Sequence, residues 1–321
     1  MSRGNLVRLG MLALAWGASF LFIKLALEGL SPLQIVLGRV SAGAIVLWAI
    51  LALRRQPMPR GRRLWAHLTA LGVIANIIPF FLIGYGEERI TSGLAGVLNG
   101  ATPLFTLLFA LGLLPEERLS LPRGLGLGLG FLGVLLVVGP WDTNPLTSSL
   151  PGQLACLGAS ACYAVAFVYT RRYVSGTGYP PASLAAGQLG AAAALLWLAA
   201  PLVAGGDVAL TSTVVASVLA LGAVGTGLAY LLYYHLIAEA GATSTSMVTY
   251  LIPVVAVALG VLVLDEPLGW NLFAGAAVVI LGVALAEGRL DGVAGLPRAR
   301  PRGTRPAHGG DPVEEGVAPG G

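Results

Sequence analysis

Residues 91–114 read TSGLAGVLNGATPLFTLLFALGLL, a run without a single charged side chain. The run is long enough to cross the hydrocarbon core of a bilayer, which takes roughly 20 apolar residues. A second run, TSTSMVTYLIPVVAVALGVLVL, covers residues 243–264, and its Pro253 lies 150 residues after Pro103. Together the two runs indicate a membrane protein that is built from two related halves.

The composition of the whole chain also favours a membrane protein. Of its 321 residues, 56% are hydrophobic and 11% are charged, whereas soluble domains have about a quarter charged residues. Backbone groups in lipid must be hydrogen-bonded within their own segment, so each apolar run is expected to be a helix. The predicted spans are 6–27, 33–53, 64–85, 91–114, 124–140, 151–170, 182–204, 213–236, 243–264 and 270–287.

Lysine and arginine residues are concentrated in alternate loops. Sixteen of the nineteen lie before or at the very start of span 1, after span 10, or between spans 2 and 3, 4 and 5, and 6 and 7. Positively charged loops stay in the cytoplasm, so we expect an inner (plasma) membrane protein with both termini cytoplasmic. The distribution of these residues also argues against reading the net charge of +4 as a sign of nucleic-acid binding. The predicted partners are therefore the bilayer and a small-molecule substrate, with no nucleic acid, and a homodimer is left open.

Further matches extend the repeat. Arg39, seven residues after Pro32, corresponds to Gln188, seven residues after Pro181. Each half has five spans, an odd number, so the halves must lie in the membrane with opposite orientations, as in many secondary transporters. The predicted fold is all-α and integral to the membrane, with ten transmembrane helices arranged as two inverted five-helix repeats. The predicted units are a first repeat at 6–140, a second repeat at 150–287 and a disordered cytoplasmic tail at 288–321.

Short motifs recur in the same order in both halves. Asn99-Gly100-Ala101-Thr102-Pro103-Leu104 precedes Glu-Arg-Leu at 117–119, and Leu251-Ile252-Pro253-Val254 precedes Glu266-Pro267-Leu268. With these motifs, and with Trp16-Gly17 in span 1, the chain resembles the EamA family of the drug/metabolite transporter superfamily. The resemblance implies a cavity surrounded by spans 1, 3, 4, 6, 8 and 9, and export of amino acids, metabolites or toxic compounds. Either Glu116 or Glu117 fits the first acidic motif.

Polar and aromatic side chains within the spans mark a candidate substrate site. Asn99 in span 4 matches Thr249 in span 9, and Asn76 in span 3 matches Thr226 in span 8. A cavity for a small polar solute needs apolar walls with a few polar groups, although such groups also join neighbouring helices. The predicted substrate-binding residues are Trp16, Asn76, Asn99, Thr102, Tyr163, Thr226, Tyr230, Thr249 and Tyr250.

Charged groups inside the spans are few. Lys24 and Arg39 lie in the outer thirds of spans 1 and 2, where they are expected either to attract an anionic group or to pair with Glu28 or Glu266. No acidic residue falls in the middle of a predicted span, so no midplane proton relay is visible. An organic cation would find no carboxylate to replace its lost hydration. We therefore expect neutral or zwitterionic solutes, amino acids first; a multidrug-type exporter of hydrophobic compounds is the alternative.

An intramembrane enzyme and a membrane scaffold are the less favoured classes. No span has paired aspartates, a Ser-His arrangement at compatible depth, or metal-ligand spacing such as His-Glu-x-x-His. No P-loop for ATP hydrolysis is present. We therefore expect a transporter and not an enzyme, with no catalytic residue, metal or cofactor. Substrate identity, direction of movement, proton coupling and oligomeric state are left open.

Overall fold

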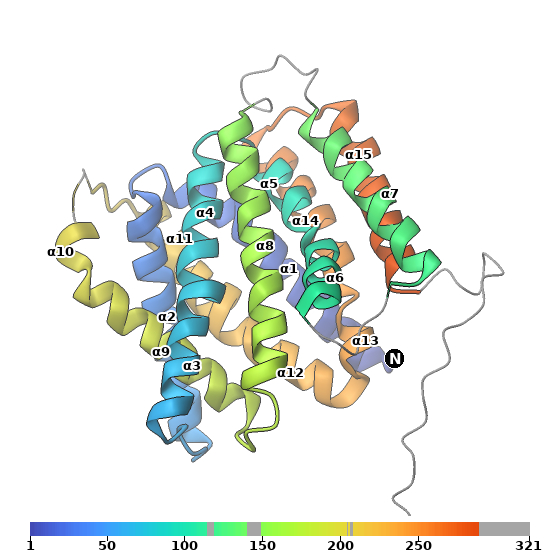
Figure 1. Ribbon diagram of the computed structural model, residues 1–321. Coiled ribbons are helices and arrows are strands. Elements are labelled where there is room, and N and C mark those ends of the chain that lie inside the picture. The colour runs from blue at the N-terminus through green and yellow to red at the C-terminus, as the bar shows by residue number, and fades with distance from the viewer. Residues whose placement is uncertain (114–118, 140–148, 204, 206–207, 289–321) are drawn as a thin grey trace, which may run out of the picture.

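The computed structural model describes residues 1–113, 119–139, 149–203, 205 and 208–288. Two sequence-based interpretations lie outside the described residues: the choice between Glu116 and Glu117, and the disordered tail from residue 289 onward. The described part of the chain consists of helices joined by short connections, with no strand among them. Figure 1 shows these helices packed side by side as a bundle.

The helices fall into ten segments, five in each half. The first half contains α1 (Arg3–Ala26), α2 (Pro32–Leu53), the run α3 (Arg62–Gly72), η1 (Val73–Ile77) and α4 (Ile78–Glu87), the pair α5 (Ser92–Asn99) and α6 (Thr102–Leu113), and α7 (Leu121–Val138). The second half contains α8 (Leu150–Tyr173), α9 (Pro181–Leu198) with α10 (Ala200–Val203), the run α11 (Ser212–Leu219), η2 (Ala220–Leu228) and α12 (Ala229–Ala240), the pair α13 (Ala242–Thr245) and α14 (Val248–Leu264), and α15 (Trp270–Ala286).

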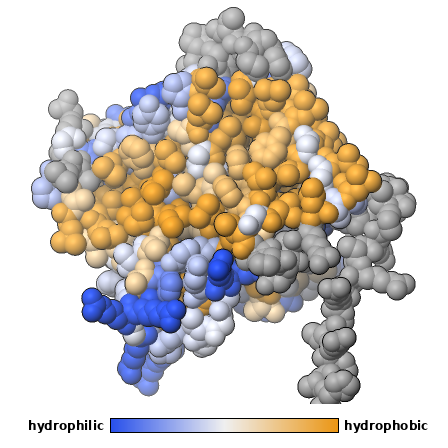
Figure 2. Space-filling model, viewed as in Figure 1, coloured by the Kyte–Doolittle hydropathy of each residue, from blue (hydrophilic) through white to orange (hydrophobic). Residues whose placement is uncertain are grey.

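Helix lengths agree with membrane crossing. Eight of the described helical runs are long and apolar enough to cross a membrane, and α14 and α15 are shorter apolar helices. Each of these two has 17 residues, the lower end of the length that a bilayer requires. Figure 2 shows a broad apolar band across the face in view, with polar residues below it and at its upper left, as a lipid-facing surface requires. The predicted fold of ten helices in two halves is confirmed.

Local sequence explains where helices begin and break. The Ser31 hydroxyl accepts a hydrogen bond from the amide of Gln34, whose side-chain oxygen accepts one from the Ser31 amide, and Pro32 occupies the first turn of α2. The fourth segment breaks between Asn99 and Thr102. Pro103 has no amide hydrogen to continue a helix, so it is accommodated in the first turn of the new helix α6.

Helix contacts repeat when the two halves are exchanged. Helix α1 packs against α14, and exchanging the halves gives the equivalent contact of α8 with α5 and α6. Likewise α2 packs against η2 while α9 packs against α3, and α4 packs against α8 while α12 packs against α1. Three pairs map onto themselves: α2 with α9, α5 with α14, and α7 with α15. This exchange is what a two-fold axis between inverted halves produces.

Candidate functional site

The third and eighth segments each contain a π-helical stretch near the centre of the segment. Segment η1 covers Val73–Ile77 and η2 covers Ala220–Leu228, so the two stretches occupy equivalent places in the repeats. A π-helical turn displaces backbone groups from the regular α-helical ladder, and such turns are frequent at functional sites. Asn76 lies in η1 and Thr226 lies in η2, and both side chains are buried.

Five polar side chains from both halves meet at these π-helical stretches. The Arg39 Nε donates a hydrogen bond to Thr226 Oγ1 at 3.0 Å. In the equivalent place of the other half, Gln188 Nε2 donates to Asn76 Oδ1 at 2.6 Å. Asn76 Nδ2 in turn donates to the Tyr230 hydroxyl at 3.3 Å. We call Arg39, Asn76, Gln188, Thr226 and Tyr230 the central polar cluster.

The Arg39 guanidinium is the one full charge of the central polar cluster. Its side chain is buried, with 6% of its surface exposed, and its guanidinium carbon lies 3.8 Å from the centre of the Phe80 ring. The Tyr163 and Tyr230 hydroxyls and the Glu87 carboxyl lie within electrostatic range of it. Among the described residues the guanidinium has one hydrogen bond, to Thr226, and no carboxylate within ion-pair distance. Neither Glu28 nor Glu266 pairs with it.

Lys24 is also not in an ion pair with a described residue. Its ammonium donates hydrogen bonds to the main-chain oxygens of Glu87 and of Ile90, the latter at 2.9 Å. Glu266 instead accepts hydrogen bonds from the Ser92 amide at 2.7 Å and from the Gly93 amide at 3.0 Å. These amides begin helix α5, where a carboxylate satisfies free N–H groups and the helix dipole.

Apart from Tyr163, which lies near Arg39, the other predicted site residues have their described contacts outside the central polar cluster. Thr249 and Tyr250 line a small pocket between α5, α14 and α15, together with Gly100 and Pro253. The Tyr250 hydroxyl donates to Glu287 at 3.0 Å. Most of the predicted substrate-binding residues are therefore divided between the central polar cluster and this pocket. Thr102 and Trp16 belong to neither: Thr102 donates to the main-chain oxygen of Asn99 at 2.7 Å, and Trp16 packs against Tyr233.

Two side chains near these places have buried oxygen atoms without a described partner. Asn99 Oδ1 is buried and has no hydrogen bond to a described residue. Glu87, which ends α4, is completely buried, and neither of its carboxylate oxygens has a hydrogen-bond donor among the described residues. Glu87 is not among the predicted site residues because it lies two residues beyond the predicted end of its span. Gln188 is not among them either, although it is the repeat equivalent of Arg39.

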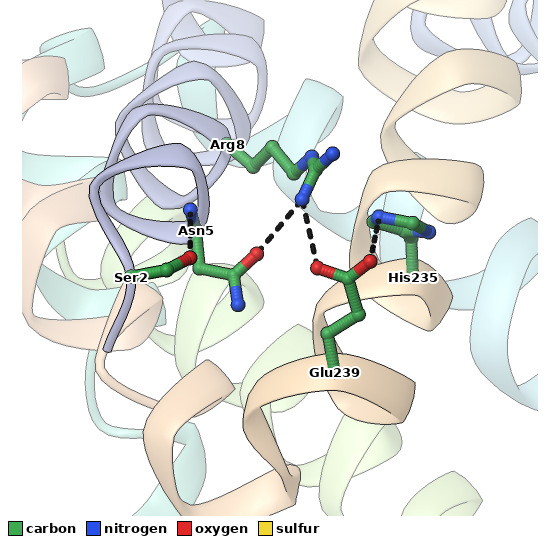
Figure 3. A network of polar contacts seen from close by, with 5 residues as sticks. All are labelled: Ser2, Asn5, Arg8, His235 and Glu239. Atoms are coloured by element: carbon green, nitrogen blue, oxygen red, sulfur yellow. Dashed lines mark hydrogen bonds and ion pairs between the residues drawn. The ribbon is translucent and has the colours of Figure 1, made fainter.

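At the end of the bundle away from Glu87, an exposed polar network links α1 and α12. As Figure 3 shows, Arg8 Nη1 donates to Asn5 Oδ1 at 2.9 Å and lies 2.8 Å from Glu239 Oε2. His235 Nε2 lies 3.0 Å from the other oxygen of Glu239. The network joins the start of α1 to the end of α12. No three His, Cys, Asp or Glu side chains of the described chain gather as metal ligands.

Comparisons with known proteins identify the family. The model of the EamA-like transporter family matches residues 7–139 and 150–287. An uncharacterized transporter of Archaeoglobus fulgidus is 26% identical over 275 residues, which are 84% of this chain and 93% of that protein. An uncharacterized protein of Pseudomonas aeruginosa is 30% identical over 276 residues, covering 85% of this chain and 90% of that protein.

Two further similarities agree. The uncharacterized inner membrane transporter YedA of Escherichia coli is 26% identical over 279 residues, which are 85% of this chain and 87% of that protein. A solved crystal structure of a protein superposes with a TM-score of 0.64 and 22% identity, covering 89% of this chain and 98% of that one. That likeness shows the fold alone. The two family matches together span nearly all of the helical part, and the chain therefore belongs to the EamA-like transporter family as a multi-pass membrane transporter of small molecules.

Proposed function

We propose that this transporter carries small solutes that bear a carboxylate, with neutral and zwitterionic amino acids first. The observation that carries the proposal is the Arg39 guanidinium, which is buried at the contact between the halves. Its one hydrogen bond to a described residue uses Nε and leaves the two terminal amino groups for a ligand. A guanidinium presents these amino groups as a planar fork that matches a carboxylate.

Energetics support a ligand at this place. Burying an ion without a partner costs several kcal/mol even after the protein relaxes. The Phe80 ring below the guanidinium offsets about 0.5–2 kcal/mol by a cation–π contact, which is the smaller quantity. A solute carboxylate would supply the missing charge, and it would do so at the interface of two inverted repeats, where secondary transporters bind their substrates.

Neutral groups around Arg39 suit the rest of such a solute. Asn76, Gln188 and Tyr230 together offer amide and hydroxyl groups that donate or accept hydrogen bonds. The second charge of a zwitterion is an ammonium, which can donate hydrogen bonds to these oxygens. The aromatic rings of Phe80 and Tyr163 add apolar wall at the same place. A wholly hydrophobic compound would leave the guanidinium unpaired, so the multidrug alternative is disfavoured.

The proposal is tested with purified protein in liposomes. Uptake of labelled L-alanine is measured alone and in competition with other amino acids, their carboxamide derivatives and a quaternary ammonium dye. We expect Arg39→Gln to weaken competition by carboxylates about tenfold or more, because a hydrogen bond to a charged group contributes about 1.5–3 kcal/mol. Arg62→Gln, which removes an exposed arginine, serves as the matched control.

Several outcomes would contradict the proposal. Transport of the dye without any amino acid would mean that the solute is a cation. Equal competition by an amino acid and its carboxamide would mean that the carboxylate is not recognised. Thermal stabilisation gives an independent check, since a solute that binds the folded protein raises its stability according to the ratio of its concentration to its Kd. That stabilisation should be lost in Arg39→Gln.

A further inference from the structure

Glu87 is a buried acid in a protein whose other described acids are exposed or hydrogen-bonded. Its exposed surface is 0%, and both carboxylate oxygens lack a hydrogen-bond donor within the described ranges. Its neighbour Glu88 is exposed and pairs with Arg89 at 2.6 Å. Glutamates are almost never fully buried unless they are paired. A fully buried glutamate without a described hydrogen-bond donor, such as Glu87, is therefore unusual.

The charged and titratable groups that face Glu87 come from four neighbouring segments. They are Lys24 from α1, Arg39 from α2, Cys156 from α8 and Glu266 from the turn between α14 and α15. None of the described ion pairs includes Glu87. Lys24 comes closest to pairing, but its ammonium is bound to the main-chain oxygens of Glu87 and Ile90. Among the described residues, none makes a hydrogen bond or ion pair with the carboxyl that would stabilise a negative charge.

An ionised carboxylate is costly in this position. Desolvating an unpaired charge costs several kcal/mol, and a group so placed neutralises instead. The two cations act on Glu87 from beyond contact, and Glu266 opposes them with a like charge. In the arrangement described here, the carboxyl therefore holds a proton.

The same contacts close this end of the bundle, which we call the Glu87 end. Lys24 ties α1 to the last turn of α4, and a cation is favourable beside the free carbonyls that end a helix. Ile90 and Ser92, in the turn after α4, are buried as well. Across the same end, the Ala209 amide donates to the Gly29 main-chain oxygen at 2.9 Å. Glu87 has no exposed surface in this arrangement, so water reaches it only if this end of the bundle opens.

We propose that Glu87 is a proton-binding site that couples transport to the movement of a proton. The carboxyl is protonated while the Glu87 end is closed. When that end opens, the O–H bond of the carboxyl breaks, the proton passes to a water molecule, and the carboxylate pairs with the Lys24 ammonium released from the backbone. Taking a proton back from water reverses these steps and lets the end close. The inference rests on the transport function of the family and not on the nature of the solute.

Infrared spectroscopy of the purified protein tests the proton itself. At neutral pH we expect the wild type to show the C=O stretching band of a protonated carboxylic acid, because the exposed acids are ionised there. The band should be absent in Glu87→Gln and unchanged in Glu88→Gln, the matched control at the exposed neighbouring position. A spectrum of the wild type without a band that Glu87→Gln removes would overturn the proposal.

Spin-label distances test the link between the proton and opening. Spin labels are attached to cysteines introduced by Glu28→Cys and Leu150→Cys, at exposed positions of the Glu87 end. Their distance reports on the separation of α1 from α8, which packs on α4. The native Cys156 and Cys162 are replaced by Ala. We expect the separation to increase as the pH rises in the wild type, in Glu88→Gln and in Glu87→Asp. Glu87→Gln, which mimics the protonated acid, should stay closed at every pH. An identical pH response in Glu87→Gln and the wild type would overturn the proposal. Because both measurements are made without solute, they stand whether or not Arg39 binds a carboxylate.

Discussion

Arg39 and Gln188 occupy equivalent positions in the two repeats, and each donates a hydrogen bond to the equivalent π-helical residue of the opposite half. Arg39 in the first half reaches Thr226 in the second, and Gln188 in the second half reaches Asn76 in the first. One arm of this symmetric arrangement is charged and the other is neutral. The duplication therefore supplies the geometry of the central polar cluster, and a single difference between the repeats supplies its charge.

The neutral arm of the cluster should contribute to stability. Replacing Gln188 by Leu leaves the buried Asn76 Oδ1 without its donor at 2.6 Å. An unsatisfied buried polar group costs about 1–3 kcal/mol, so we expect a lower unfolding temperature in detergent. Arg39 keeps its own bond to Thr226 in this variant.

A double-mutant cycle separates the hydrogen bond from the change in side-chain shape. In the double variant Gln188→Leu with Asn76→Leu, no polar atom of this pair is left unsatisfied, so part of the lost stability should return. If the two substitutions are strictly additive, Gln188 and Asn76 do not interact in the folded protein.

Glycines make the close contact between α7 and α15, the pair at the edge of the bundle in Figure 1. A Cβ on Gly282 would meet the backbone of Gly130, and one on Gly133 would lie 2.9 Å from the Val278 carbonyl carbon. Gly282→Ala should therefore push the helices apart and lower stability by more than about 1 kcal/mol. Gly128→Ala is the matched control: a Cβ there meets nothing within 4 Å, and alanine favours the helix by roughly 0.5–1 kcal/mol. Equal effects at both positions in thermal unfolding would refute the role of close packing.

The spans and the duplication could be predicted from sequence because both depend on simple quantities. An uncharged run such as 91–114 has few alternatives to a membrane helix. The motifs around Pro103 recur in the same order around Pro253, 150 residues later. Arg39 lies in its predicted span, but neither of the partners considered for it, Glu28 and Glu266, pairs with it. Hydrophobic pattern gives the depth of a side chain, whereas the bond to Thr226 depends on how two distant helices pack.

Glu87 and the π-helical stretches show what the pattern does not contain. Glu87 follows an apolar run, as the exposed Glu28 does, and only tertiary packing buries one and not the other. A π-helical turn leaves no mark in hydropathy, because an inserted residue shifts the register of a helix without changing its mean polarity. Asn76 and Thr226 could be paired as repeat equivalents, but the widened turn around each one required the structure.

The network at the Arg8 end should matter little for stability. The Arg8 and Glu239 side chains are 37% and 44% exposed, and solvent screens such pairs so that they contribute roughly 0–1 kcal/mol. We therefore expect Arg8→Ala and Glu239→Gln to unfold within a few degrees of the wild type. A loss of stability comparable with that of Gln188→Leu would show that this end of the bundle depends on the ion pair.

The arginine asymmetry predicts which end faces the cytoplasm. Positive residues cluster at the Arg8 end, including Arg60 between α2 and α3, and positive loops remain cytoplasmic. Reporter fusions or labelling of single cysteines should place Arg60 and Gly288 in the cytoplasm, and Glu28 and Asp265 on the opposite side. Finding Arg60 and Asp265 on the same side would contradict the inverted arrangement of the repeats.

Asn99 offers a test that separates a binding residue from a packing residue. Its Oδ1 is buried without a described partner, beside the break between α5 and α6. If the group only packed, the native state would bear the cost of an unsatisfied buried oxygen, about 1–3 kcal/mol, without any gain. We predict that the oxygen is satisfied by the solute or its water during transport. Asn99→Leu should then raise or preserve the unfolding temperature, and it should lower transport at unchanged membrane abundance. Such an exchange of activity for stability is typical of substitutions at functional sites. The Ser160 hydroxyl, which donates to the Leu98 main-chain oxygen at 3.2 Å, gives the control Ser160→Ala, where we expect transport to be kept. Normal transport in Asn99→Leu would assign Asn99 to packing alone.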